Sequence, residues 1–375
     1  MKQTKGLYPA PLKIAEVLEK SAAAGFGTPA AFKAEAEGFG QLTMEPVTKA
    51  MINIFNARTH CAKNHWGKPE QVPKELAILG AGLMGAGIAE VSIGKGYQVI
   101  MKDAQLEGLD AGSKVITDGL QKKVKRRKMS QWDADMVAER LKPTLDYSAI
   151  ANSDVIIEAV PEILDLKHRI IKEVEAVAKP DHVFATNTSG LLVREIAAAH
   201  SNPANVIGMH YFSPVPKMEL LEIIVTDETS EETLKRAVAV GLKQKKLIIV
   251  AKDVPGFYCN RCLAPALKEV LRMFQEGVDP NKINKLSGQA GFAVGTATLI
   301  DEVGVDIAMH AADNIGCNPM YGARMNGGDV SFLAKLIEAG AGGKKTKKGV
   351  FDYTDKKKKN VVSDAFKAVQ KEVLY

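Results

Sequence analysis

The sequence predicts an α/β protein with a Rossmann-type, doubly wound parallel sheet, a helical N-terminal extension and an all-helical C-terminal domain. In the middle of the chain, short apolar segments alternate with helix-sized segments, which is typical of parallel strands linked by helices. Before and after this region the patterns are helical, and Gly/Pro-rich turns separate the parts. We therefore expect a linker-like extension at 1–72, a dinucleotide-binding domain at 73–253 and a helical domain at 254–375.

The N-terminal extension is rich in alanine, lysine and glutamate, and it predicts three helices, at 11–24, 30–37 and 44–57. Its first residues lack the apolar core of a secretory signal and the Arg/Ser-rich character of a transit peptide.

The central region predicts buried strands, because each candidate is a short run of β-branched and other apolar residues. These runs lie at 76–79, 97–101, 155–157, 183–185, 206–209 and 247–250. The long connection at 104–151 is expected to hold two helices. After the last strand we expect helices at 257–275, 280–289, 297–315 and 330–339.

The composition is that of an ordinary globular protein, with 46% hydrophobic and 25% charged residues among 375. Four cysteines are too few for a disulfide framework, and Cys259 and Cys262 form a C-x-x-C pair without a second pair, so we expect no metal site. No apolar run reaches the roughly 18 residues of a membrane span. The net charge of +6 is modest, and we expect no nucleic-acid partner.

The first strand runs into the sequence Gly80-Ala81-Gly82-Leu83-Met84-Gly85, a G-x-G-x-x-G that opens a helix. The first glycine permits a tight turn, the second lets the backbone approach a pyrophosphate, and the third allows close packing of helix and strand. The amides that open the helix, at Leu83 and Met84, face the same anion. This arrangement predicts a dinucleotide site.

Asp103 ends the second strand, about 20 residues beyond the glycines, where an acid can accept hydrogen bonds from ribose hydroxyls. A carboxylate there would repel a 2′-phosphate, and the next residue is Ala104 rather than an arginine. Both features favour NAD over NADP. Lys102 is adjacent, but alternation along the strand should point it the other way.

His210 follows a strand at the carboxyl edge, where open α/β sheets bind ligands. Oxidation of an alcohol by hydride transfer needs a base for the hydroxyl proton, and histidine suits this role. Glu222 lies in an otherwise apolar run, where a carboxylate needs a partner. Taken alone, either residue could be structural. Beside a dinucleotide site, the two predict a catalytic base and its orienting acid.

Several phrases together resemble the 3-hydroxyacyl-CoA dehydrogenase family from Gly80 to Tyr353. They are Asn187-Thr188-Ser189, Gly208-Met209-His210-Tyr211-Phe212-Ser213-Pro214-Val215, and Pro255-Gly256-Phe257 with Asn260-Arg261. The second of these phrases, with serine at 213, looks most like the dehydrogenase part of the mitochondrial trifunctional protein's alpha subunit. Residues 6–11 and 301–306 share this likeness.

The resemblance implies roles for residues at matching positions. His210 would be the general base and Glu222 its partner, with Ser189 and Asn260 bound to the 3-oxygen and thioester. Residues that would contact the cofactor are Glu162, Lys167, Asn187 and Lys345. Residues that would contact the substrate are Ser213, where single-function relatives carry asparagine, and Lys125 or Arg126, near the CoA phosphates.

The resemblance also implies the function: NAD-dependent oxidation of an L-3-hydroxyacyl-CoA to a 3-ketoacyl-CoA in fatty acid β-oxidation. An alternative is a non-catalytic subunit that binds NAD and acyl-CoA within a β-oxidation complex. We expect a homodimer through the helical C-terminal domain, or a cap on that domain formed by residues 1–70. A mitochondrial matrix location is expected by resemblance alone, and the acyl chain length is left open.

Overall fold

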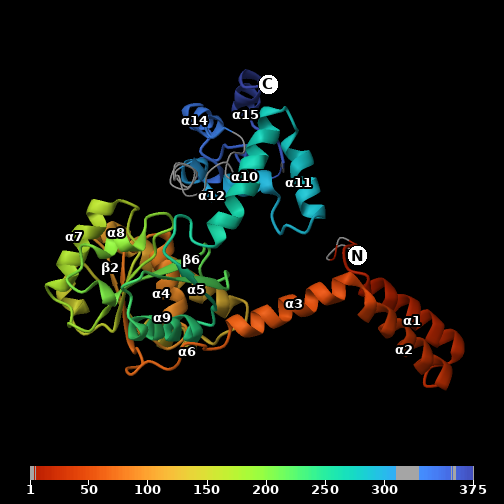
Figure 1. Ribbon diagram of the computed structural model, residues 1–375, viewed down its shortest axis with the longest axis horizontal. Helices are drawn as coiled ribbons and strands as arrows, with labels where there is room; N and C mark the ends of the chain where they lie inside the picture. Colours follow the sequence, from red (N-terminus) through yellow and green to blue (C-terminus); the bar gives the residue numbers. More distant parts are fainter. Residues whose placement is uncertain (1–3, 5, 310–328, 356, 358–359, 375) are drawn as a thin grey trace. The chain divides into compact units, whose positions relative to one another are not determined.

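The computed structural model describes residues 4, 6–309, 329–355, 357 and 360–374 (Figure 1). These residues form two compact units. One unit consists of residues 61–264, and the other contains the described residues before 61 and after 264.

The unit of residues 61–264 is built on an eight-stranded sheet with the order β3-β2-β1-β4-β5-β6-β7-β8. The strands are β1 (Glu75–Leu79), β2 (Gln98–Lys102), β3 (Leu141–Thr144), β4 (Val155–Glu158), β5 (Val183–Thr186), β6 (Val206–Tyr211), β7 (Leu220–Val225) and β8 (Leu247–Lys252). The chain winds outward from β1 in both directions, so the prediction of a doubly wound α/β fold is confirmed.

Two strands were not among those expected. The connection at 104–151 holds the two expected helices, Leu106–Lys125 and Gln131–Ala138, and also β3. β3 is a partly exposed edge strand that contains Pro143, so it lacks an apolar pattern. β7 runs antiparallel to β6, and the expectation of an entirely parallel sheet is wrong for this pair. The physical reason is the short connection at 212–219, since a parallel neighbour needs a crossover of a dozen or more residues.

Helices cover both faces of this sheet. Alternate β1 residues belong to different cores: Leu76 and Ile78 pack on one face, and Ala77 and Leu79 on the other. The first core includes residues from α4 (Leu83–Ile93), α5 (Leu106–Lys125), α6 (Gln131–Ala138) and α9 (Glu231–Lys243). The second includes residues from α7 (Leu164–Glu175) and α8 (Val193–Ala197).

The C-terminal helices are α10 (Cys259–Gln275), α11 (Pro280–Gln289), α12 (Thr296–Val303), α14 (Ser331–Glu338) and α15 (Asp364–Glu372). Their core contains Phe274, Phe332 and Phe366, whose ring centroids lie 4.8–5.7 Å apart. The helix expected at 297–315 is interrupted, because Gly304 adopts a left-handed φ of 102° after α12. Positions 310–315 lie outside the described residues.

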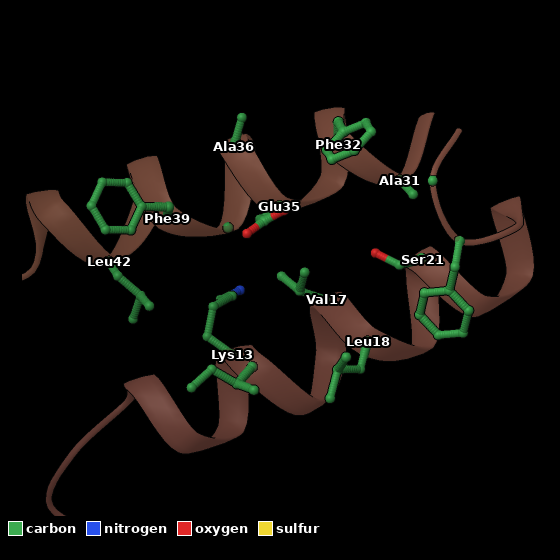
Figure 2. Close-up of a pocket in the computed structure, with 14 residues that line it drawn as sticks. Lys13, Val17, Leu18, Ser21, Ala31, Phe32, Glu35, Ala36, Phe39 and Leu42 are labelled. Atoms are coloured by element: carbon green, nitrogen blue, oxygen red, sulfur yellow. The ribbon is translucent and has the colours of Figure 1, made fainter. Parts of the chain in front are cut away.

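The N-terminal helices are α1 (Ala10–Ala24), α2 (Pro29–Met44) and α3 (Pro46–Cys61). α1 and α2 pack side by side and enclose a groove of about 700 Å³ (Figure 2). The groove is mostly apolar, with Lys13 and Glu35 among its lining residues, and it contains none of the site residues expected from the sequence. No helix in the described part of the chain is long and apolar enough to span a membrane.

Candidate active site

The glycine-rich loop connects β1 to α4. Gly80 has a left-handed φ of 99°, and a Cβ there would lie 2.7 Å from the carbonyl oxygen of Ala159. A Cβ on Gly85 would lie 1.8 Å from the carbonyl oxygen of Gly80, so only glycine permits this close packing of helix and loop. A Cβ on Gly82, in contrast, would meet nothing within 4 Å. The second glycine therefore leaves open space where the helix N-terminus presents its amides, as a bound pyrophosphate would require.

Asp103 directly follows β2 and lies beside this loop. Its Oδ2 accepts a hydrogen bond from the Ala81 amide at 2.7 Å, and its Oδ1 accepts one from the Gln105 amide at 3.1 Å. The neighbouring Lys102 points elsewhere, with its Nζ 3.8 Å from the centre of the Tyr147 ring. The carboxylate is thus anchored at the glycine loop, where its negative charge would repel the 2′-phosphate of NADP.

His210 and Glu222 meet across the β6–β7 pair, in which they occupy directly opposed positions. His210 Nδ1 lies 2.6 Å from Glu222 Oε2. A carboxylate can only accept, so the neutral imidazole donates from Nδ1 and its Nε2 is left as a base. Both side chains are buried. The rings of Phe212 and Phe257 lie against the imidazole, at centroid distances of 4.5 and 5.7 Å.

The second oxygen of Glu222 accepts hydrogen bonds from the Tyr258 and Cys259 amides, at 3.1 and 2.9 Å, at the start of α10. Burial raises the pKa of Glu222, but these bonds and His210 outweigh it and hold that pKa below its usual value. Burial, together with the Glu222 carboxylate, raises the pKa of the Cys259 thiol to about 12. Glu222 therefore stays ionised beside a thiol that stays protonated.

The residues after β5 form a turn at 187–190 that faces the same edge. Asn187 Oδ1 accepts a hydrogen bond from the Tyr211 amide at 2.8 Å, next to His210. Asn260 Nδ2 donates to the carbonyl oxygen of Ser189 at 3.1 Å. These bonds link Asn187 to the end of β6 and Asn260 to Ser189 in the same turn.

Glu162 and Lys167 are also close together, with Glu162 Oε2 3.2 Å from Lys167 Nζ. A second carboxylate on this lysine, Glu158, was not among the sequence-derived site residues. It ends β4 and is fully buried, and its Oε1 lies 2.8 Å from Lys167 Nζ. The signal that could have revealed it is the one that revealed Glu222, an acid within an otherwise apolar strand.

The remaining expected site residues are Lys125, Arg126, Ser213 and Lys345. Lys125 and Arg126 are exposed at the end of α5. Ser213 is exposed after β6. Lys345 belongs to the other compact unit, where its Nζ donates to Asp306.

Known families match most of the chain. Residues 75–254 match the family model of the 3-hydroxyacyl-CoA dehydrogenase NAD-binding domain, and residues 256–353 match that of the C-terminal domain of the same enzyme. The fatty acid oxidation complex subunit alpha of Vibrio parahaemolyticus is 39% identical over 359 residues, which are 95% of this chain and 50% of that protein. The chain therefore spans about half the length of the curated relatives it matches.

Solved structures resemble the chain in the same region. FadB2 of M. tuberculosis is 30% identical with a TM-score of 0.72, and the match covers 76% of this chain and 100% of that one. (S)-3-hydroxybutyryl-CoA dehydrogenase PaaH1 from Ralstonia eutropha is 29% identical with a TM-score of 0.70 and the same coverage, 76% and 100%.

Proposed function

Because the chain belongs to the 3-hydroxyacyl-CoA dehydrogenase family, we propose that it oxidises an L-3-hydroxyacyl-CoA to a 3-ketoacyl-CoA with NAD. Its place would be in fatty acid oxidation, the process named for the Vibrio relatives. Since those relatives are about twice as long, the proposal concerns the activity of this part alone.

The observation that carries the proposal is the buried His210–Glu222 pair at the carboxyl edge of an NAD-binding sheet. When bound, NAD supplies the acceptor for the hydride that leaves C3 of the substrate. His210 Nε2 takes the proton of the C3 hydroxyl while the C3–O bond becomes a carbonyl. The imidazolium that forms keeps its proton on Nδ1 and donates a hydrogen bond from there to Glu222. The negative charge of Glu222 stabilises the imidazolium.

We propose the supporting roles that the family resemblance implies. Asn260 Nδ2 donates a hydrogen bond to the Ser189 carbonyl oxygen at 3.1 Å. These two residues would hold the 3-oxygen and the thioester. Asn187 would orient the nicotinamide end from its hydrogen bond to the Tyr211 amide. Ser213 and the basic end of α5 would contact the CoA portion, and Lys345 would contact the cofactor.

We further propose that the helical C-terminal domain pairs with a second copy of the chain. In α10, Leu263 and Leu267 are only half-buried, although the next turns, with Val270 and Leu271, enter the core. Half-buried apolar side chains of this kind can be covered by a partner chain. Two-fold pairing is the commonest closed symmetry of oligomers. Light scattering on the full chain and on a form without residues 1–70 tests this. A full-length monomer that dimerises only after truncation would identify the extension as a cap instead.

The activity is tested by the appearance of NADH on mixing the protein with NAD and L-3-hydroxyacyl-CoAs of increasing chain length. Turnover should depend on the CoA thioester and on the L configuration. Binding of NAD and acyl-CoA without NADH formation would favour the non-catalytic alternative.

A further inference from the structure

Glu158 is a fully buried carboxylate at the carboxyl end of β4. Its Oε1 accepts from Lys167 Nζ at 2.8 Å and from the Val160 amide at 2.8 Å. Its Oε2 accepts from Lys167 Nζ at 2.9 Å and from the Thr186 hydroxyl at 2.7 Å. The carboxylate therefore joins the ends of two adjacent strands, β4 and β5, to α7.

Lys167 links this carboxylate to a second one. Its side chain is 1% exposed, and its Nζ lies within 3.2 Å of three carboxylate oxygens, two from Glu158 and one from Glu162. An ammonium has three donors. Lys167 Nζ donates hydrogen bonds to both oxygens of Glu158 and forms an ion pair with Glu162 at 3.2 Å. Lys167 therefore acts on the site by holding Glu162, and a buried ammonium in this position depends on the charge of Glu158.

Glu162 in turn holds the turn that carries the substrate contacts. Its Oε1 accepts hydrogen bonds from the Thr188 hydroxyl at 2.6 Å, the Ser189 amide at 2.8 Å and the Gly190 amide at 3.1 Å. Burial raises the pKa of Glu162, but Lys167 and these bonds keep it below its usual value, so the carboxylate stays an acceptor. The 187–190 turn is thus tied to Glu158 through Lys167 and Glu162.

We propose that Glu158 is a positioning residue for the dehydrogenase reaction, which fixes the 187–190 turn through Lys167 and Glu162. The inference rests on the proposed function for its kinetic consequence, but the ordering of the turn does not depend on it. Within this turn, Asn187 is hydrogen-bonded to Tyr211 and Ser189 to Asn260. A small displacement of the turn is therefore transmitted to the groups around His210. A misplacement of about 1 Å can cost about 100-fold in rate.

The test compares Glu158→Gln with Glu158→Gln/Lys167→Met. In the single variant Lys167 loses the more deeply buried of its two carboxylate partners and keeps Glu162. In the double variant the charges of Glu158 and Lys167 are both removed, which a buried site tolerates better. Each should lower kcat by about 10- to 100-fold. In Glu158→Gln the dissociation constant of NAD should change much less. Because both act through one chain of contacts, the double variant should be no slower than the slower of Glu158→Gln and Lys167→Met measured singly.

The matched control is Asp154→Asn, at the other end of β4. Asp154 also accepts hydrogen bonds from two backbone amides, of Lys74 and Glu75, and one from a lysine, Lys179, but it contacts none of the site residues in these bonds. It should lose stability and keep kcat. If a folded Glu158→Gln, or the double variant should the single fail to fold, turned over at the wild-type rate, the positioning role would be overturned.

A second readout separates this inference from the proposed function. Hydrogen–deuterium exchange of the peptide that contains the Ser189 and Gly190 amides should be faster in the Glu158 variants and unchanged in Asp154→Asn. If the wild-type protein forms no NADH but the exchange changes as expected, the function is wrong and the structural link stands. Unchanged exchange in a folded Glu158 variant would overturn the link whatever the activity.

Discussion

His210 and Glu222 occupy directly opposed positions in the antiparallel pair β6–β7, and the 2.6 Å contact between Nδ1 and Oε2 fixes the imidazole with Nε2 free to accept a proton. This relationship depends on the reversal of β7. In a parallel pair with aligned ends, the two residues would be offset by two positions, about 7 Å along the strands, because His210 is the fifth residue of β6 and Glu222 the third of β7.

His210→Ala should lower kcat by about 100- to 10,000-fold, the range that loss of a general base costs. NAD binding, measured by calorimetry, should be nearly unchanged, because the glycine loop and Asp103 make no hydrogen bond to His210 among those of the described residues. Near-normal turnover in this variant would exclude His210 as the base.

Glu222→Gln keeps the size of the side chain and removes its charge. Its amide nitrogen can donate to Nδ1, which would place the imidazole proton on Nε2, the wrong tautomer for a base. The expected loss in kcat is again about 100- to 10,000-fold, as for replacement of an orienting carboxylate in other histidine-based sites. Turnover is measured with a saturating acyl-CoA. A loss smaller than threefold would show that Glu222 does not orient the base.

The protein should prefer NAD to NADP. Asp103→Asn retains an oxygen that can accept from the Ala81 amide but removes the charge that would repel a 2′-phosphate. This variant should therefore weaken NAD binding and narrow the ratio of the two kcat/KM values. A wild-type kcat/KM for NADP equal to or above that for NAD would contradict the assignment.

Two glycine substitutions should separate cofactor binding from folding. Gly82→Ala adds a methyl group in open space, so the melting temperature should stay close to that of the wild type while NAD binding weakens by about tenfold or more, roughly 1.4 kcal/mol. Gly85→Ala would place its Cβ 1.8 Å from the Gly80 carbonyl oxygen, so it should lower both stability and binding. Equal effects of the two substitutions on stability would contradict the distinct roles of the glycines.

A buried histidine pair should make stability depend on pH. His182 Nδ1 donates to the Lys179 carbonyl at 2.7 Å, its Nε2 accepts from His200 Nε2 at 3.3 Å, and His200 Nδ1 accepts from the Asn202 amide at 3.0 Å. The neutral pair satisfies every ring nitrogen, and adding a proton to either ring breaks one of these bonds.

Burial lowers the pKa of both His182 and His200 below the ordinary value of 6.5. Glu175, 3.3 Å from His200 Nδ1, opposes this shift for His200, and Asp181 opposes it for His182. The unfolded chain then binds more protons than the folded one below pH 6.5, so the contribution to stability is complete above that pH and is lost as the pH falls below it. In the wild type, the urea concentration at the unfolding midpoint should be lower at pH 5.5 than at pH 7.5. These two pH values lie about one unit to either side of the ordinary pKa of histidine.

The matched variant for this pair is His200→Gln, which keeps a donor and an acceptor but takes up no proton in this range. Its urea midpoint should change less over the same interval. An equal change in the variant and the wild type would assign the pH dependence to other groups.

Much of the fold follows from local patterns. The apolar runs that predicted six strands all lie in strands of the sheet, and the glycine loop lies between β1 and α4 as expected. The two strands that the patterns did not place are those whose surroundings are unusual. β3 is an exposed edge with a proline, and the direction of β7 depends on the length of the preceding connection rather than on its own residues.

The sequence by itself determined the residue types of the site and the strand ends where they lie, because burial and strand ends leave a local record in apolar runs, glycines and isolated acids. It identified Glu222 as an acid in need of a partner but gave no distance to His210. Only the tertiary structure supplied that distance, and only it showed that Glu158, Lys167 and Glu162 form one chain of contacts. The physical reason is that local periodicity specifies which face a side chain occupies, whereas the distance between two side chains depends on strand order, direction and register.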